Sequence, residues 1–317
     1  MQIQRDLLGP VGIDGCLHIV EDRQDDPRPA RQRLGDRTPR LFQVRAVLSK
    51  GHVAHEAIRA SITPGEGGCF ITAPDDIRLS APGGAYDISR NSRGELAQAT
   101  RSLTASSYAE AFDVFLAGLT PSLDHLSYSS NTPIRIDAIE CRDEANHITA
   151  ISYRTPFGTA VLSEGGSEIS TPLFPIYALY REALNADSNF YRFFCFHKIL
   201  EGGFLQIRPK LFRAARDQGI SIATCQDVVP DEPELRQFQP AYIGQRIRDL
   251  YDGEFQTQYR HSVAHFALTD ESISNPSSYR ESSRFATILF VAQVCARELI
   301  KNLEEQYADF FRQGGHI

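Results

Sequence analysis

The stretch from Ser278 to Arg312, SYRESSRFATILFVAQVCARELIKNLEEQYADFFR, decides the fold of the C-terminal half of this chain. Ser278 and Glu281 have the spacing of a capping box, which satisfies free backbone N–H groups at the start of a helix. Apolar residues then recur every three or four positions, at Phe285, Ile288, Leu289, Ala292, Cys295, Leu299, Leu303, Tyr307 and Phe310. This spacing puts them on one face. The sequence therefore predicts a helix about 50 Å long with a continuous buried stripe.

Shorter helices are predicted upstream of this stretch. One covers 175–185, and a second begins at a cap on Asp187 or Ser188 and stops at Gly202–Gly203. The second is apolar nearly all round, so we expect it at the centre of a bundle. Further helical patterns span 209–218, 241–251 and 254–267. Together they predict a C-terminal helical bundle.

The N-terminal part has the shorter period of strands. Residues 41–48, with 57–62 as a hairpin partner, and the pair 134–139 and 148–153 alternate apolar and polar side chains. One helix, near 107–119, opens with a capping box of Ser107 and Glu110. Residues 21–40 hold three prolines and six arginines and predict a mobile loop. The fold class is α+β, with a β-rich domain over 1–166 and a helical bundle over 167–317.

Composition narrows the function classes. Apolar residues make up 42% and charged residues 23%, as in a folded globular protein. The net charge of −7 argues against broad nucleic-acid binding but leaves room for a small basic site. Six cysteines include no Cys-x-x-Cys pair, which excludes a zinc ribbon and suggests a reducing compartment. The polar first residues and the short apolar runs predict a cytoplasmic protein with no membrane partner.

No cofactor is expected, because the glycine-rich turns at 65–68 and 82–84 lack the Gly-Lys-Ser/Thr ending of a phosphate loop. One segment does carry candidate chemistry, the run YRHSVAHF from Tyr259 to Phe266 on a predicted helix. It resembles the Arg-x(4–6)-His motif of the HEPN superfamily. That resemblance implies a homodimer whose two motifs meet in one cleft, and metal-independent RNA cleavage or nucleotide binding. Arg260 would hold phosphate, His265 would be the acid or base, and His261 would be an auxiliary polar group.

These residue types suit that chemistry. An imidazole can take a proton from a ribose 2′-hydroxyl or give one to the leaving oxygen, and a guanidinium can stabilise charge on the phosphate. On an α-helix, however, Arg260 and His265 lie roughly 140° apart. They converge only through the length of the arginine or across two subunits. The alternative is structural, with the histidines in polar niches between helices and Arg260 beside a carboxylate.

A metal site is the third possibility. His261 and His265 have the i, i+4 spacing of zinc ligands, with Glu254 or Asp270 as a further ligand. The zinc-protease pattern needs a glutamate after the first histidine, and Ser262 stands there instead. A second small cluster consists of His52, His55 and Glu56. Nothing in the sequence selects either Glu254 or Asp270 as the third ligand, and a pair of histidines on a surface turn is seldom a ligand set, so we expect no metal.

The whole chain also resembles the methylamine-utilisation protein MauJ family. The segments that carry this resemblance are 123–128 with 131–133, 190–202 and 260–266. It implies an association with amine metabolism and no particular mechanism. Two hypotheses follow: an HEPN-like ribonuclease or nucleotide-binding module acting on RNA or a nucleotide, and a non-enzymatic accessory protein that binds a protein partner through its N-terminal domain.

Overall fold

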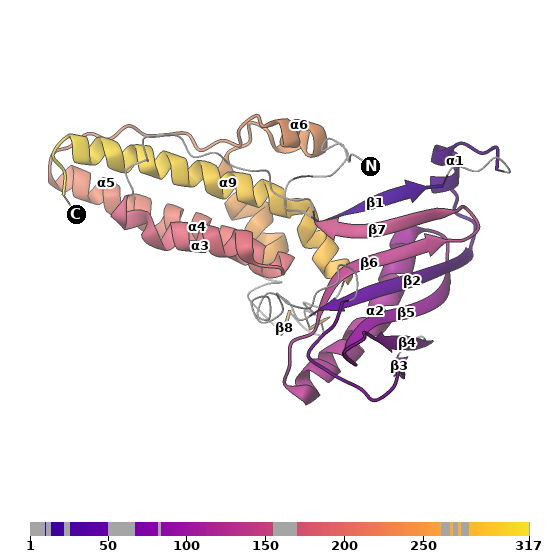
Figure 1. Cartoon of the computed structure of the whole chain (residues 1–317). Coiled ribbons are helices and arrows are strands. Elements are labelled where there is room, and N and C mark those ends of the chain that lie inside the picture. Colours follow the sequence, from indigo (N-terminus) through magenta and orange to yellow (C-terminus); the bar gives the residue numbers. More distant parts are fainter. Residues whose placement is uncertain are drawn as a thin grey trace. The chain divides into compact units, whose positions relative to one another are not determined.

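The computed structural model describes residues 10, 14–21, 26–49, 67–81, 84–154, 170–260, 267–268, 272–273 and 279–316. The chain forms two compact units. Residues 14–154 with 277–280 make the strand unit, and residues 1–13, 155–276 and 281–317 make the helical unit. Strands therefore gather in the first half of the chain and helices in the second (Figure 1). The predicted α+β class is confirmed.

The strand unit is built on a seven-stranded antiparallel sheet. Its strands are β1 (Asp14–Val20), β2 (Arg40–Ser49), β3 (Ile77–Ala81), β4 (Gly84–Arg90), β5 (Leu96–Ala105), β6 (Arg135–Asp143) and β7 (Ile148–Arg154). They lie in the order β1-β7-β6-β2-β5-β4-β3. The predicted β6–β7 hairpin is confirmed. The central strand β2 pairs with β5 and β6, while its predicted partner 57–62 lies outside the described residues.

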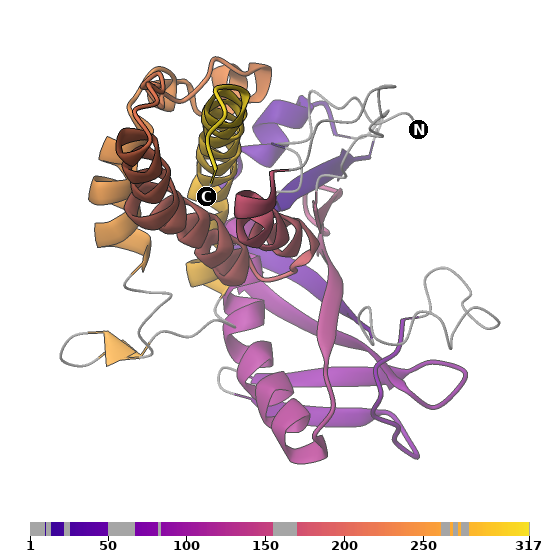
Figure 2. The same cartoon turned by 90° about the vertical axis from the view of Figure 1, so that its left-hand side faces the viewer.

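Helix α2 (Tyr108–Ser130) covers one face of this sheet, against β2, β3, β5 and β6 (Figure 1 and Figure 2). Every second residue of β2 from Phe42 to Leu48 is buried, as the alternating pattern predicts. Ser107 caps the helix by accepting a hydrogen bond from the Glu110 backbone N–H at 3.2 Å. The helix ends at Asn131, whose left-handed φ of 51° is typical of a helix C-terminus.

The prediction of a mobile loop over 21–40 is wrong for its described residues. They contain the short helix α1 (Ala30–Leu34), and Arg33 on it is only 5% exposed. Its guanidinium donates to the carbonyl oxygens of Asn146 at 3.0 Å and Glu21 at 2.9 Å. This segment has few apolar side chains to bury, and hydrogen bonds from Arg33 to backbone carbonyls elsewhere in the chain hold it in place instead. A pattern of neighbouring residues does not reveal such bonds.

The helical unit contains α3 (Phe174–Asn185), α4 (Asn189–Gly202), α5 (Arg208–Asp217), α6 (Pro233–Phe238), α7 (Ile247–Leu250) and α9 (Tyr279–Arg312). Two short 3₁₀ turns, η3 (Thr171–Leu173) and η5 (Pro240–Tyr242), precede α3 and α7. The long helix α9 runs alongside α4 and α5 (Figure 1). The predicted stripe of α9, from Phe285 to Phe310, is buried throughout. Ser188 caps α4 as predicted, by accepting from the Tyr191 N–H.

The predicted helix stop at Gly202–Gly203 is wrong. The chain passes through η4 (Gly203–Ile207), a π-helical turn, directly into α5. A Cβ on Gly203 would lie 2.6 Å from Leu299 Cδ2, so the glycine serves close helix packing rather than chain reversal. Burial against α9 thus outweighs the low helix propensity of glycine.

The predicted helices 241–251 and 254–267 also differ from the observed elements. The segment α7 continues into a second π-helical segment, η6 (Tyr251–Arg260). Ala267 lies in the two-residue strand β8 (Ala267–Leu268), which pairs with β9 (Ser272–Ile273). The prediction was therefore correct from Ile247 to Arg260, and wrong at 243–246, which are not helical, and at Ala267.

Two further features concern the predictions made for the cysteines and for membrane-spanning segments. All six cysteines are among the described residues and all are free, with Cys195 and Cys295 fully buried as expected. None of the described helices combines the length and hydropathy needed to cross a membrane.

Candidate functional site

Of the three predicted site residues, the structure describes only Arg260. It is the last residue of η6 and is half-buried. His261 and His265 lie outside the described residues, so their distance from Arg260 stays a prediction. Segments of π-helix are rare and occur often at functional sites. Arg260, at the end of such a segment, therefore lies at the kind of position that is often functional.

Near Arg260 lies a buried histidine that the sequence reasoning did not select. His197 on α4 is 1% exposed, and its ring packs against Tyr251 with centroids 5.2 Å apart. Neither ring nitrogen has a hydrogen-bond partner within the described part of the chain. Unpaired buried polar groups are uncommon and usually mark a strained or functional position.

Burial lowers the pKa of His197 from its ordinary 6.5 to about 4. The carboxylate of Glu201, one turn along α4, opposes this effect, while the positive charges of Lys198 and Arg260 add to it. Lys198 also donates to Glu201, and this hydrogen bond is the main reason that the pKa of Glu201 is lowered. His197 is therefore neutral at physiological pH, close to the Lys198–Glu201 ion pair and to the guanidinium of Arg260.

The metal reading finds no support in the described residues. Among them, no group of three or more histidine, cysteine, aspartate or glutamate side chains could hold a metal ion. Glu254, one of the proposed ligands, accepts hydrogen bonds from the Tyr242 hydroxyl at 3.1 and 3.3 Å. The alternative ligand Asp270 and the cluster of His52, His55 and Glu56 lie outside the described residues.

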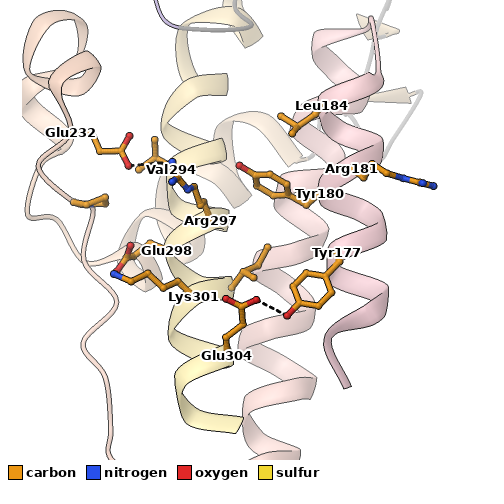
Figure 3. Close-up of a pocket in the computed structure, with 12 residues that line it drawn as sticks. Tyr177, Tyr180, Arg181, Leu184, Glu232, Val294, Arg297, Glu298, Lys301 and Glu304 are labelled. Atoms are coloured by element: carbon orange, nitrogen blue, oxygen red, sulfur yellow. Dashed lines mark hydrogen bonds and ion pairs between the residues drawn. The ribbon is translucent and has the colours of Figure 1, made fainter. Parts of the chain in front are cut away.

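A groove of about 750 Å³ lies in the helical unit between α3, α9 and the chain at 230–232 (Figure 3). This volume is within the usual range of small-molecule sites. Its apolar lining consists of Tyr177, Tyr180, Leu184, Pro230, Val294 and Ile300. Its charged lining consists of Arg181, Glu232, Arg297, Glu298, Lys301 and Glu304.

At one end of the groove, Tyr177 on α3 donates its hydroxyl to Glu304 Oε1 on α9 at 2.6 Å (Figure 3). Burial, the hydrogen bond and the charge of Glu304 all raise the pKa of Tyr177. The phenol is therefore a fixed donor at neutral pH. Within the described part of the chain, Glu304 has no ion-pair partner.

The other carboxylates of the groove face cations. Arg297 approaches Glu232 at 3.8 Å, and Lys301 approaches Glu298 at 3.7 Å. Tyr180 lies between the ends of the groove and points toward Arg297, whereas Arg181 points away from it (Figure 3). The Tyr180 ring packs on Phe196 of α4, with centroids 5.6 Å apart. This contact helps to fix the orientation of the Tyr180 ring.

The sequence reasoning missed this groove. On α3 the spacing of Tyr177, Tyr180, Arg181 and Leu184 is that of one helix face. That face was visible as an amphipathic pattern, but the pattern does not say which other helix lies opposite or how far away. The contact from Tyr177 to Glu304 joins residues 127 positions apart. Only the packing of α3 against α9 brings them together.

Comparison with known proteins gives one family. Residues 176–301 match the model of the family described as methylamine utilization protein MauJ. No curated protein and no solved structure matches the chain. The matched segment starts in α3 and ends within α9, so it includes His197, Arg260 and most of the groove. Over these residues the chain is similar to methylamine utilization protein MauJ.

Proposed function

We propose that this chain serves methylamine utilisation as an accessory protein whose helical unit binds a ligand. The observation that carries the proposal is the coincidence of the family match with the groove. Every residue that lines the groove, except Glu304, falls within residues 176–301. The matched segment therefore contains a concave surface with an aromatic floor and a few converging polar groups, which is the usual form of a binding site.

Gene deletion in the source organism tests this function. The deletion strain should grow more slowly with methylamine as its nitrogen source and normally with ammonium. The full chain, supplied on a plasmid, should restore growth. Equal growth of the deletion and parent strains on methylamine would refute the proposal. The ammonium culture is the control for a general growth defect.

A second candidate function is the HEPN-like one, cleavage of RNA or binding of a nucleotide at a dimer cleft. It is favoured by the state of Arg260. Its guanidinium is close enough to His197 and Glu201 to influence both electrostatically, yet it forms no ion pair within the described residues. An arginine with no ion pair among the described residues, beside a neutral imidazole, suits a phosphate group. His265 and His261 would supply the acid–base chemistry.

This candidate is tested with labelled RNA and purified protein in a chelator. Wild-type protein should release fragments with cyclic-phosphate ends, and Arg260→Ala and His265→Ala should abolish the release while remaining folded. Arg246→Ala is the matched control, because Arg246 is a mostly exposed arginine on the same segment of chain. Uncleaved RNA with wild-type protein, or a strictly monomeric protein, would contradict the nuclease function.

A further inference from the structure

We infer that the groove between α3 and α9 binds an organic ammonium ion carried on an apolar body. The inference deepens the proposed function and rests on it for the link to amine metabolism. Its physical basis is separate, and lies in the charges, the aromatic rings and the size of the groove.

The first step concerns charge. Of the six charged side chains in the lining, Arg181 points away and four form two ion pairs, Glu232 with Arg297 and Glu298 with Lys301 (Figure 3). This leaves Glu304. Because Arg181 points away and each of the other cations is paired with a carboxylate, Glu304 is the one carboxylate of the lining that has no ion pair among the described residues.

The second step concerns the free face of that carboxylate. Glu304 Oε1 accepts from Tyr177, and within the described part of the chain no donor reaches Oε2. The hydrogen bond fixes the carboxylate in place, so a ligand has little side-chain entropy to remove. An ammonium group is the complementary ligand, since it offers both opposite charge and N–H donors. An anion would meet repulsion at this end.

The third step concerns the remainder of the ligand. Tyr177 and Tyr180 present rings to the groove, and Leu184 and Val294 extend the apolar surface beyond them. Tyrosine rings attract cations through their negative faces and also bind apolar groups. A ligand with an ammonium head at Glu304 could therefore lay an aryl or alkyl body along Tyr180 toward Leu184.

The fourth step concerns size. A groove of about 750 Å³ is suited to a ligand of many heavy atoms. Methylamine has two, and most of the groove would remain filled with water around it. We therefore expect amines with larger bodies to bind more tightly than methylamine itself.

Calorimetric titration of the purified full chain with methylamine and with three probes that share a phenethyl body tests the ligand class. The probes are phenethylamine, 2-phenylethanol and 3-phenylpropionate, used near neutral pH, where the amine and the carboxylate are ionised. Phenethylamine should bind saturably and more tightly than the alcohol, the carboxylate and methylamine. Tighter binding of 3-phenylpropionate, or no binding of any probe, would overturn the inference. This series needs no variant, so it does not depend on a mutant folding.

Two matched variants then locate the site. Glu304→Gln removes the charge and keeps an oxygen to accept from Tyr177. It should weaken phenethylamine binding by about tenfold or more while leaving 2-phenylethanol unaffected. Glu305→Gln, at the exposed neighbouring position, should behave as wild type. Unchanged affinity for phenethylamine in the Glu304→Gln protein would overturn the assignment.

The outcomes separate this inference from the proposed function. If the deletion strain fails on methylamine but the groove binds no amine, the accessory function stands and the ligand assignment falls. If the groove binds amines but the deletion strain grows normally, the site is real and the link to methylamine utilisation falls.

Discussion

Replacing Gly203 with alanine should destabilise the helical unit, whereas the same change at Gly202 should not. Both glycines have helical backbone angles, φ −63° and ψ −49° at Gly203 and φ −61° and ψ −42° at Gly202. Alanine therefore improves helix propensity equally at the two sites, by about 0.5–1 kcal/mol. What differs is the space around the new methyl group.

At Gly202 a Cβ meets nothing within 4 Å. At Gly203 it would lie 2.6 Å from Leu299 Cδ2 and 3.4 Å from Leu303 Cδ1. Both leucines are fully buried, so neither can swing into solvent. Overpacking of this kind costs about 1–3 kcal/mol. Since the propensity gain is common to both variants, the difference between them should equal the overpacking cost.

Urea unfolding followed by far-ultraviolet circular dichroism measures this difference. Gly202→Ala should match or exceed the wild-type midpoint, and Gly203→Ala should fall below it. Adding Leu299→Ala to Gly203→Ala should cost less than the sum of the two single changes, because the smaller side chain makes room for the methyl group. Equal midpoints for the two glycine variants would refute the close approach of η4 to α9.

Two other predictions concern buried charge and pH. Asp227→Ala should lower the free energy of unfolding in urea by about 3–5 kcal/mol. Asp227 forms a mostly buried ion pair with Arg208, and its loss leaves the Arg208 guanidinium without that partner. Asp231→Ala, at an exposed pair, should cost at most about 1 kcal/mol, and equal losses would contradict this reasoning. The pKa of His197 is lower in the folded protein, so the unfolded chain binds the extra proton as pH falls from about 6.5 to about 4. Wild type should lose up to about 3 kcal/mol of stability across this window. The profile of His197→Phe should be flatter there, and parallel profiles would count against a buried neutral histidine.

Predictions from sequence succeeded where neighbours along the chain decide the outcome. The capping side chains Ser107 and Ser188 lie within three residues of the N–H groups they satisfy. The apolar period of α9 repeats every turn, so it is visible in any short window. Alternation in β2 likewise needs only adjacent residues. Each of these signals is local, and each element formed as expected.

The candidate sites were harder to predict. His197 was hidden in an apolar helix, where a histidine is one polar residue among phenylalanines. Arg260 stood out because of its motif, but its neighbours His197 and Glu201 come from another helix, some 60 positions earlier. No periodic pattern carries that information, because it depends on how two helices pack.

The sequence by itself determined the α+β class, the long C-terminal helix and the capped starts of α2 and α4, since periodicity and capping act within a few residues. Tertiary structure alone decided the strand order, the passage of the chain through Gly203 and the meeting of Tyr177 with Glu304. Packing decided these features because their energies arise between side chains distant in sequence. In a sequence, a glycine can mark the end of a helix or a point where another helix approaches closely. Only the residue that packs against it, here Leu299 against Gly203, shows which role it has.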